Sequence, residues 1–365
     1  MTSFTTPSNS ITFKINYTNM IKGVAIILLM FNHFCVIKEW ILIPNYICDF
    51  TVLGKNISAY IGAFGKICIA IWAFLSGIGA YYNYQKPHAY HKTIKKMINL
   101  CLIYWFILFT TYIPTIYLCN LKQYDLSFNN IIANMIACDA DYNKAAWYLR
   151  FHIMFVLTFP LYKIILNKIS NSFISYSTIF ILLILLQYLP KTSTYICNIS
   201  LSSLINEYCQ YMQIIILGYL SAQYKILEAI GRFFLSFNKK YAVGMTILII
   251  IIVMGIRSTT KNIFLGLPTN IDLFLIIPLL GTLFYIFMIS PDKIKSLFEY
   301  LGKTSIVIWL FHWIFNLGSY HIQAIIYYPK VSYLVIILCL VISLLYYKVI
   351  KFFINKTPLN LIISL

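Results

Sequence analysis

Residues 22–33 read Lys-Gly-Val-Ala-Ile-Ile-Leu-Leu-Met-Phe-Asn-His, and this stretch opens an apolar run that continues to about residue 41. Comparable low-charge runs of about 18 residues or more recur almost to the C-terminus. Each is long enough to cross a hydrocarbon core of about 30 Å as a helix. The runs are continuous rather than alternating, which excludes a transmembrane barrel. Because a chain in lipid must satisfy its own backbone polar groups, the runs predict transmembrane helices.

The composition of the whole chain agrees with this interpretation. Its 365 residues are 61% hydrophobic and only 10% charged, whereas a soluble domain carries roughly 25% charged residues. So few charges could not cover the surface of a water-soluble protein of this length. We therefore expect an all-α integral membrane protein, a multi-pass bundle of about ten transmembrane helices. The expected spans lie near residues 23–41, 58–83, 98–119, 145–162, 172–189, 209–224, 241–257, 271–290, 304–320 and 331–350.

The distribution of lysine and arginine residues sets the expected orientation. The net charge is +18, and basic chains often bind nucleic acid. Here the basic residues lie between apolar spans, so we expect no nucleic-acid partner. Segments on the side of the two termini hold more than twice as many Lys and Arg residues as the opposite segments. Cytoplasmic loops carry such an excess, so both termini are expected in the cytoplasm.

The loops are short and no internal repeat or linker is visible, so residues 1–365 are expected to form a single membrane domain. Residues 1–22 are expected to be a polar cytoplasmic segment leading into it, because no small-residue cleavage site follows the first apolar run. The nine cysteines form no CxxC motif and no cluster with histidine, so no metal is expected. A disulfide near the outer face is left open for Cys119, Cys138, Cys197 and Cys209.

An ionisable side chain inside a membrane span is costly, so it is a candidate for function. Lys22 and His33 are eleven residues apart, which at 100° per residue places them about 20° from alignment on one helix face. They are then about 16 Å apart along the helix axis. A surface cation and a deeper imidazole on one stripe suit a site that holds an anionic cofactor and moves protons. Alternatively, His33 is a structural hydrogen-bonding residue and Lys22 only a topology signal.

Two further elements lie near the end of the second expected span and just after it. Ser76 lies in a Ser-Gly-Ile-Gly stretch, where small residues let helices approach closely. Ser76 either serves this packing or hydrogen-bonds a substrate. Lys92 and Lys95 are about one helical turn apart and would form a phosphate-binding edge, or they belong to a positive-inside cluster.

Later spans carry ionisable residues as well. Trp147 opens a span in which Arg150 and His152 follow, and Trp147 alone could belong to an interfacial aromatic belt. His312 lies about two turns beyond a basic helix entry, much as His33 does. Two histidines with similar placement make a lone core histidine less plausible for either. The candidate ion-pair partners of Arg150 are Glu207 and Asp272.

These pieces together resemble the acyltransferase type 3 family of integral membrane acyltransferases. The resemblance is distributed along most of the chain in a fixed order. It rests on Lys22 to His33, Phe74 to Gly77, the basic pair Lys92 and Lys95, Trp147 to Leu149, and Gly302 to His312. The chain departs from the family where Lys22, Lys92 and Lys95 stand in place of the more usual arginine. Lysine lacks the bidentate geometry with which arginine binds phosphate.

The resemblance implies transfer of an acyl group, usually acetyl, from cytoplasmic acyl-CoA (acetyl-CoA as donor). The acceptor would be a hydroxyl of a cell-surface glycan or of its lipid-linked precursor, in a bacterial inner (plasma) membrane. A base must take the hydroxyl proton, and histidine suits that near neutral pH, so His33 is the expected catalytic base. Arg150 or His312 would stabilise the developing oxyanion or orient the acceptor.

The remaining site residues are expected to bind the two substrates. The CoA phosphates would be held by Lys22, Lys92 and Lys95. The substrate-binding residues would be Ser76, Trp147 and His152.

Two other classes of protein fit a polytopic basic chain. One is a glycan transporter or lipid-linked oligosaccharide flippase without acyl transfer. Transporters usually show internal repeats or paired broken helices, and none is visible in this sequence. The other is a glycan polymerase, for which a long outer loop is expected, whereas the longest here is about 25 residues.

Overall fold

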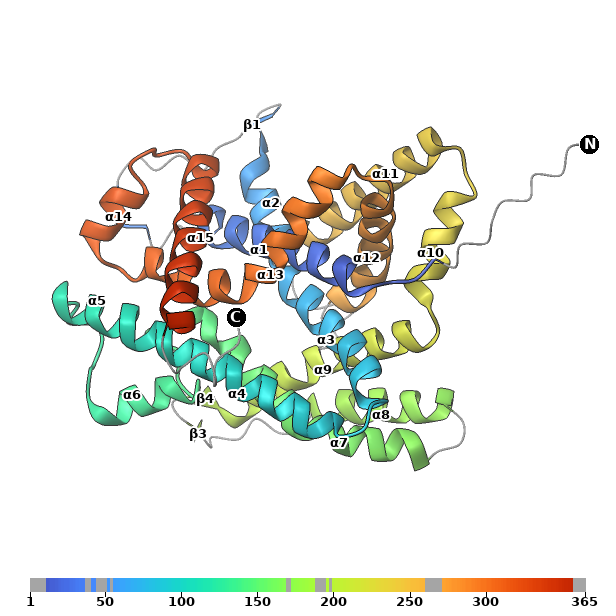
Figure 1. Ribbon diagram of the computed structural model, residues 1–365, viewed down its shortest axis with the longest axis horizontal. Helices are drawn as coiled ribbons and strands as arrows, with labels where there is room; N and C mark the ends of the chain where they lie inside the picture. The colour runs from blue at the N-terminus through green and yellow to red at the C-terminus, as the bar shows by residue number, and fades with distance from the viewer. Residues whose placement is uncertain are drawn as a thin grey trace, which may run out of the picture.

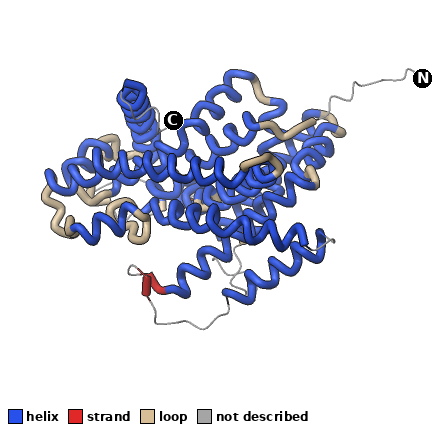
Figure 2. Tube along the Cα trace, turned by 60° about the horizontal axis from the view of Figure 1, so that its bottom comes forward, coloured by secondary structure: helices blue, strands red, loops and turns tan. Residues whose placement is uncertain are grey.

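The computed structural model describes residues 11–36, 41–43, 51–52, 55–168, 172–187, 195–196, 199–259 and 271–356. Nearly all of this is helical, as Figures 1 and 2 show, with only two short antiparallel hairpins. The hairpin strands are β1 (Thr51–Val52), β2 (Lys55–Asn56), β3 (Tyr195–Ile196) and β4 (Ile199–Ser200). The all-helical fold is confirmed.

The helices follow one another with short connections. In the first half of the chain they are α1 (Ile15–Cys35), α2 (Ile57–Gly65), α3 (Cys68–Tyr84), α4 (Ala89–Ile107), a π turn η2 (Leu108–Tyr112), α5 (Ile113–Leu118), α6 (Phe128–Met135), a 3₁₀ turn η3 (Lys144–Ala146), α7 (Trp147–Lys168) and α8 (Ser172–Gln187). In the second half they are α9 (Leu201–Gln223), α10 (Ile226–Leu235), α11 (Lys239–Thr259), α12 (Asp272–Ile289), α13 (Asp292–Phe311), a 3₁₀ turn η4 (His312–Asn316), α14 (Tyr320–Ile326) and α15 (Ser332–Lys356).

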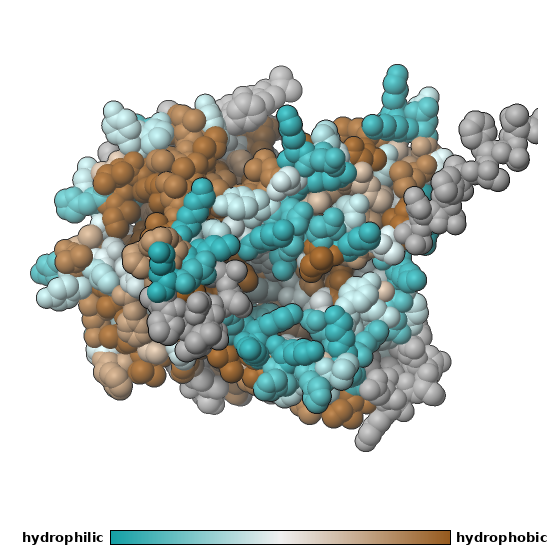
Figure 3. Space-filling model, viewed as in Figure 1, coloured by the Kyte–Doolittle hydropathy of each residue, from teal (hydrophilic) through white to brown (hydrophobic). Residues whose placement is uncertain are grey.

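Within the described residues, seven helical segments are long and apolar enough to cross a membrane. The bent pair α9 and α10, with an angle of 62° between its helices, would make an eighth. The outward faces of these segments are rich in aliphatic and aromatic side chains, as on α11 and α15. Figure 3 shows a band of hydrophilic side chains across one face, with hydrophobic surface on both sides. The chain is a multi-pass integral membrane protein.

Some expected spans differ from the helices. The first helix begins at Ile15, so the expected polar segment 1–22 ends inside a helix, and residues 1–10 lie outside the described part. The span expected at 172–189 coincides with the short helix α8, and that at 304–320 with the end of α13. The N-terminal half of α13 carries acidic and basic residues, so the apolar pattern missed it. The count of ten and the cytoplasmic termini stay predictions.

The helix α1 packs most extensively against α13, and the two cross at the centre of the molecule (Figure 1). Two glycines permit this contact. A Cβ atom on Gly302 would lie 1.7 Å from the carbonyl oxygen of Asn19, and one on Gly23 would lie 2.2 Å from that of Phe298. Only glycine therefore lets these two backbones touch. This contact sets how the last turn of α1 meets the end of α13.

A second glycine pair joins α3 to α9. A Cβ atom on Gly77 would lie 1.9 Å from the carbonyl oxygen of Ile215, and one on Gly218 would lie 2.1 Å from that of Phe74. The packing interpretation of Gly77 is therefore correct. The close α3–α9 contact holds one wall of the cavity described below.

Candidate active site

Two histidines that are 279 residues apart in the sequence meet inside the bundle. His33 lies in the last turn of α1, and His312 directly follows α13. The Nδ1 atom of His33 is 2.6 Å from the Nε2 atom of His312. The two rings are stacked, with centroids 4.8 Å apart and an angle of 21° between their planes. The sequence indicated both histidines separately, and the fold joins them.

The hydrogen bonds of this pair fix its protons. The Nδ1 atom of His312 is 2.7 Å from the carbonyl oxygen of Trp309. A carbonyl can only accept, so this Nδ1 carries hydrogen, and the Nε2 atom of neutral His312 is an acceptor. His33 must then donate its Nδ1 hydrogen to His312. The Nε2 atom of His33 is left with a lone pair, which is the state a general base requires.

The surroundings of the pair are largely aromatic and rigid. His312 is fully buried and His33 is half-buried. The ring of Trp313 meets the His33 ring edge-on, with centroids 5.3 Å apart. The side-chain amide of Asn32 donates to the carbonyl oxygen of Gly62 at 2.8 Å and ties the end of α1 to α2. The imidazole of His33 is therefore held from three sides.

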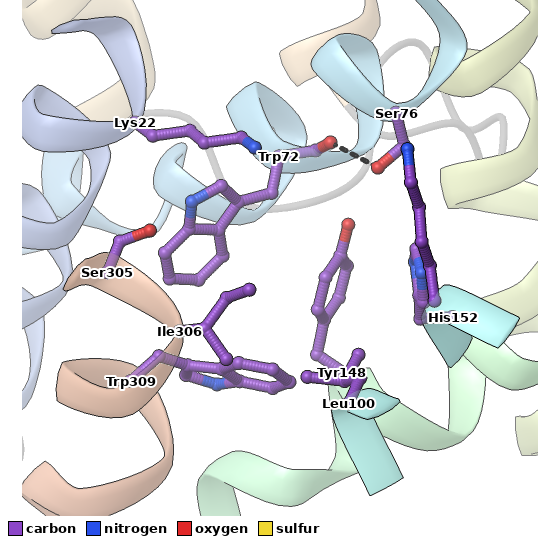
Figure 4. A pocket seen from close by; sticks show the side chains of 10 residues that line it. Lys22, Trp72, Ser76, Leu100, Tyr148, His152, Ser305, Ile306 and Trp309 are labelled. Atoms are coloured by element: carbon purple, nitrogen blue, oxygen red, sulfur yellow. Dashed lines mark hydrogen bonds between the residues drawn. The ribbon is translucent and has the colours of Figure 1, made fainter. Parts of the chain in front are cut away.

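A cavity of about 280 Å³ opens between α1, α3, α4, α7 and α13. Figure 4 shows the residues around it. They are Lys22, Trp72, Ser76, Lys96, Leu100, Tyr148, His152, Ser305, Ile306 and Trp309. Three aromatic side chains make its walls: Trp72 and Trp309 have ring centroids 5.9 Å apart, and Tyr148 and Trp309 have centroids 5.8 Å apart.

The charges around this cavity are all positive. Lys22 and Lys96 both line it, and none of its lining residues is acidic. In the described part of the chain, neither lysine takes part in an ion pair. Two cations that converge without a counter-ion raise the local positive potential. Such a cavity favours an anionic ligand.

The cavity and the histidine pair are linked through Trp309. Its ring lines the cavity, and its backbone carbonyl accepts the hydrogen bond from His312. Lys22 and His33 lie on the same helix, about 16 Å apart along its axis. Neither His33 nor His312 is among the residues that line the cavity, so Trp309 and the helix α1 are what connect the two.

The predicted binding residues fall into two groups. Lys22, Ser76 and His152 line the cavity. Lys92 and Lys95 lie exposed on α4 and are not among the lining residues. Lys96 lines the cavity, although the sequence analysis did not select it. It follows Lys92 by one helical turn, and this spacing could have indicated that it lies on the same helix face. The phosphate-binding role of Lys92 and Lys95 stays a prediction.

Trp147 and its neighbour Tyr148 have different environments. The Trp147 ring packs against Tyr211, with centroids 5.6 Å apart, and does not line the cavity. The hydroxyl of Tyr148 points into the cavity beside Ser76, as Figure 4 shows. It is buried close to the Ser76 hydroxyl, and none of the described residues makes a hydrogen bond of normal geometry with it. The hydroxyl of Ser76 is already used, since it donates to the carbonyl oxygen of Trp72 at 2.8 Å.

Arg150 lies in a separate polar cluster. Its guanidinium is 3.3 Å from the carboxylate of Glu207 and donates to the carbonyl oxygen of Cys138 at 3.1 Å. Of its two candidate partners Arg150 thus takes Glu207, because Asp272 forms a buried ion pair with Arg257. None of the hydrogen bonds of Arg150 in the described part of the chain reaches His33 or His312.

Of the four cysteines for which the sequence left a disulfide open, one forms a disulfide in the structure. Cys138 is disulfide-bonded, whereas Cys119 and Cys209 are free thiols. Cys197 lies outside the described residues. The disulfide therefore lies beside the segment whose carbonyl groups bind Arg150.

The described residues thus form a helical membrane bundle with a pair of contacting histidines and a cavity lined by two lysines. The sequence comparison makes the assignment specific: a family of acyltransferase domains, acyltransferase family 3, matches residues 15–351. The chain belongs to this family and is a membrane acyltransferase. Searches of curated proteins and of solved structures found no match.

Proposed function

We propose that the protein is an O-acyltransferase that moves an acetyl group from cytoplasmic acetyl-CoA to a hydroxyl of a cell-surface glycan or its lipid-linked precursor. The observation that carries the proposal is the chain of hydrogen bonds from His33 through His312 to the carbonyl of Trp309. It leaves the Nε2 atom of His33 as a free base. The cationic cavity next to it suits the phosphate-bearing donor.

The donor would enter at the lysine end of the cavity. Lys22 and Lys96 would bind its phosphates as point charges. Binding cavities for small molecules usually measure about 300–1,000 Å³, and this one is near the lower limit at about 280 Å³. It therefore suits the narrow acyl-pantetheine arm, while the nucleotide end would remain at the opening near Lys92 and Lys95.

The walls of the cavity suit this arm chemically. Its amide and thioester carbonyls need hydrogen-bond donors, and the buried Tyr148 hydroxyl can donate, since it makes no hydrogen bond of normal geometry with the described residues. His152 lies on the same wall and offers a second polar contact. The rings of Trp72 and Trp309 would pack against the aliphatic parts of the arm.

The chemical step follows from the protons assigned above. The acceptor hydroxyl gives its proton to the Nε2 atom of His33 while its oxygen attacks the thioester carbonyl carbon. The tetrahedral intermediate collapses, the carbon–sulfur bond breaks, and the CoA thiolate takes the proton back from His33. His312 orients His33 and shares the positive charge that forms on it, the role that a carboxylate has in a Ser-His-Asp triad.

Substitution of the histidines tests the proposal. A general base contributes roughly 10²–10⁴-fold to rate, so we expect His33→Ala and His33→Gln each to lose transfer of [¹⁴C]acetyl from acetyl-CoA to envelope glycan by that factor. The exposed histidine His321 on α14 is the matched control, and His321→Ala should transfer like the wild type. If His33→Gln kept wild-type transfer, His33 would be only a structural hydrogen-bonding residue.

Donor binding is tested separately. Lys22→Gln and Lys96→Gln should raise KM for acetyl-CoA more than they lower kcat, because they remove binding that is equal in the ground and transition states. Lys92→Gln and Lys95→Gln should do the same to a smaller extent.

The same assay tests the alternative function. If the protein were a glycan transporter without acyl transfer, neither the wild type nor any of these variants would give labelled glycan from acetyl-CoA.

A further inference from the structure

The C-terminal end of α13 places four backbone carbonyls next to the histidine pair. The last four carbonyl groups of an α-helix have no partner within the helix. In α13 they belong to residues 308–311, directly before His312. The backbone N–H of His312 donates to the carbonyl of Ile308, and its Nδ1 donates to that of Trp309. The 3₁₀ turn η4 uses the carbonyl of Phe311, and the carbonyl of Leu310 is left for donors from elsewhere in the chain. Both carbonyls also accept hydrogen bonds from side chains.

Two buried side chains supply these donors. The hydroxyl of Tyr112 donates to the carbonyl oxygens of Leu310 at 3.0 Å and Phe311 at 3.2 Å. The side-chain amide of Asn143 donates to the carbonyl oxygen of Leu310 at 2.8 Å. Tyr112 and Asn143 are both completely buried. Tyr112 ends the π turn η2 within the segment Ala89–Leu118, and such turns are frequent at functional sites.

Asn143 is also connected to the cavity. Its side-chain oxygen accepts from the backbone N–H of Ala145 at 3.1 Å and caps η3. The carbonyl oxygen of Ala145 accepts from the indole N–H of Trp309 at 3.1 Å. One end of the Asn143 amide therefore holds the backbone two residues before His312. The other end holds the turn that fixes the Trp309 ring.

We propose that Asn143 and Tyr112 are positioning residues that set the place of His312 and, through it, the orientation of His33. This inference rests on the proposed function, because it assigns their role in the same reaction. The bond between His33 and His312 is 2.6 Å long, so a displacement of about 1 Å removes it. Displacements of this size at an active site can cost about 10²-fold in rate.

The structure offers a matched control for Asn143. Asn134 on α6 is also a buried asparagine, only 1% exposed. Its side chain accepts from the backbone N–H of Tyr142 at 3.1 Å and donates to the carbonyl oxygen of Asn130 at 3.0 Å. It holds the same connecting segment, and none of its hydrogen bonds in the described part of the chain reaches α13.

The test compares Asn143→Ala and Tyr112→Phe with Asn134→Ala in detergent-purified full-length protein. We expect the first two to lower kcat for [¹⁴C]acetyl transfer by about 10–100-fold, with KM for acetyl-CoA within about twofold of the wild type. Asn134→Ala should lower the melting temperature as much as Asn143→Ala and keep kcat within about threefold. If both asparagine variants lost kcat equally, the role of Asn143 would be structural and the inference would be wrong.

A second readout does not require acyl transfer. Diethylpyrocarbonate reacts with a free imidazole nitrogen, and mass spectrometry gives its rate at His33. Asn143→Ala and Tyr112→Phe should change that rate by threefold or more, whereas Asn134→Ala should leave it unchanged. An unchanged rate in all three variants would overturn the positioning role. Absence of transfer by the wild type would instead refute the proposed function.

Discussion

The close contact of α1 and α13 predicts that Gly302→Ala separates the two histidines. The added Cβ atom would lie 1.7 Å from the carbonyl oxygen of Asn19. Carbon and oxygen atoms normally approach to about 3.3 Å, so the helices must part by about 1.5 Å at this point. The obstructing atom belongs to the backbone of α1 and cannot rotate away.

The size of the functional effect follows from the same numbers. If the helices separate as rigid bodies, the 2.6 Å distance between His33 and His312 grows to about 4 Å, which exceeds hydrogen-bond length. We expect acetyl transfer to fall by about 10²-fold, the cost of a misplacement of about 1 Å. The melting temperature in detergent should fall as well, because the tightest helix contact is lost.

Glycines elsewhere in the bundle provide the control. A Cβ atom on Gly79 of α3 or Gly255 of α11 would meet no atom within 4 Å. Alanine is a better helix former than glycine by roughly 1 kcal/mol, so Gly79→Ala and Gly255→Ala should keep transfer activity and melt no earlier than the wild type. If Gly302→Ala had the transfer activity and the melting temperature of the wild type, the inference that this contact aligns the histidines would be refuted.

Three further predictions concern the charged residues. Arg257→Leu removes the ion-pair partner of the buried carboxylate of Asp272 and should lower stability by up to about 3–5 kcal/mol in a denaturation assay. The double variant Arg257→Leu, Asp272→Leu should recover part of this loss. Arg150→Leu should lower the melting temperature, and adding Glu207→Gln should restore part of it; unchanged melting and activity would mean that Arg150 only extends to the interface. Membrane-impermeant thiol labelling of Asp141→Cys should succeed from outside intact cells, and a C-terminal reporter active on the outside would rule out the proposed topology.

The sequence predicted the helices, the stripe from Lys22 to His33 and the second histidine, because each follows from local periodicity. It could not predict the bond between His33 and His312. That bond depends on the packing of α1 against α13, two helices at opposite ends of the chain. In the sequence, Gly302 only opened the stretch from Gly302 to His312. The fold shows that it contacts the backbone of α1.

The residues that line the cavity show a second limit of prediction from the sequence. Trp147 and Tyr148 are adjacent and point about 100° apart on a helix, so an error of one residue in the assumed helix face exchanges one for the other. The same holds for Lys95 and Lys96 on α4. The ion-pair partner of Arg150 also could not be chosen from the sequence, since Glu207 and Asp272 both lie near the starts of expected spans.

Because the histidine pair joins two distant parts of the chain, it cannot form until synthesis of the chain is almost finished. His312 follows His33 by 279 residues, and ribosomes add about 5–20 residues per second. The first helix therefore waits in the membrane for roughly 15–60 s before its partner emerges. Throughout that interval the half-made chain holds an imidazole with nothing to orient it. A product that terminates before His312 would therefore lack the histidine pair permanently.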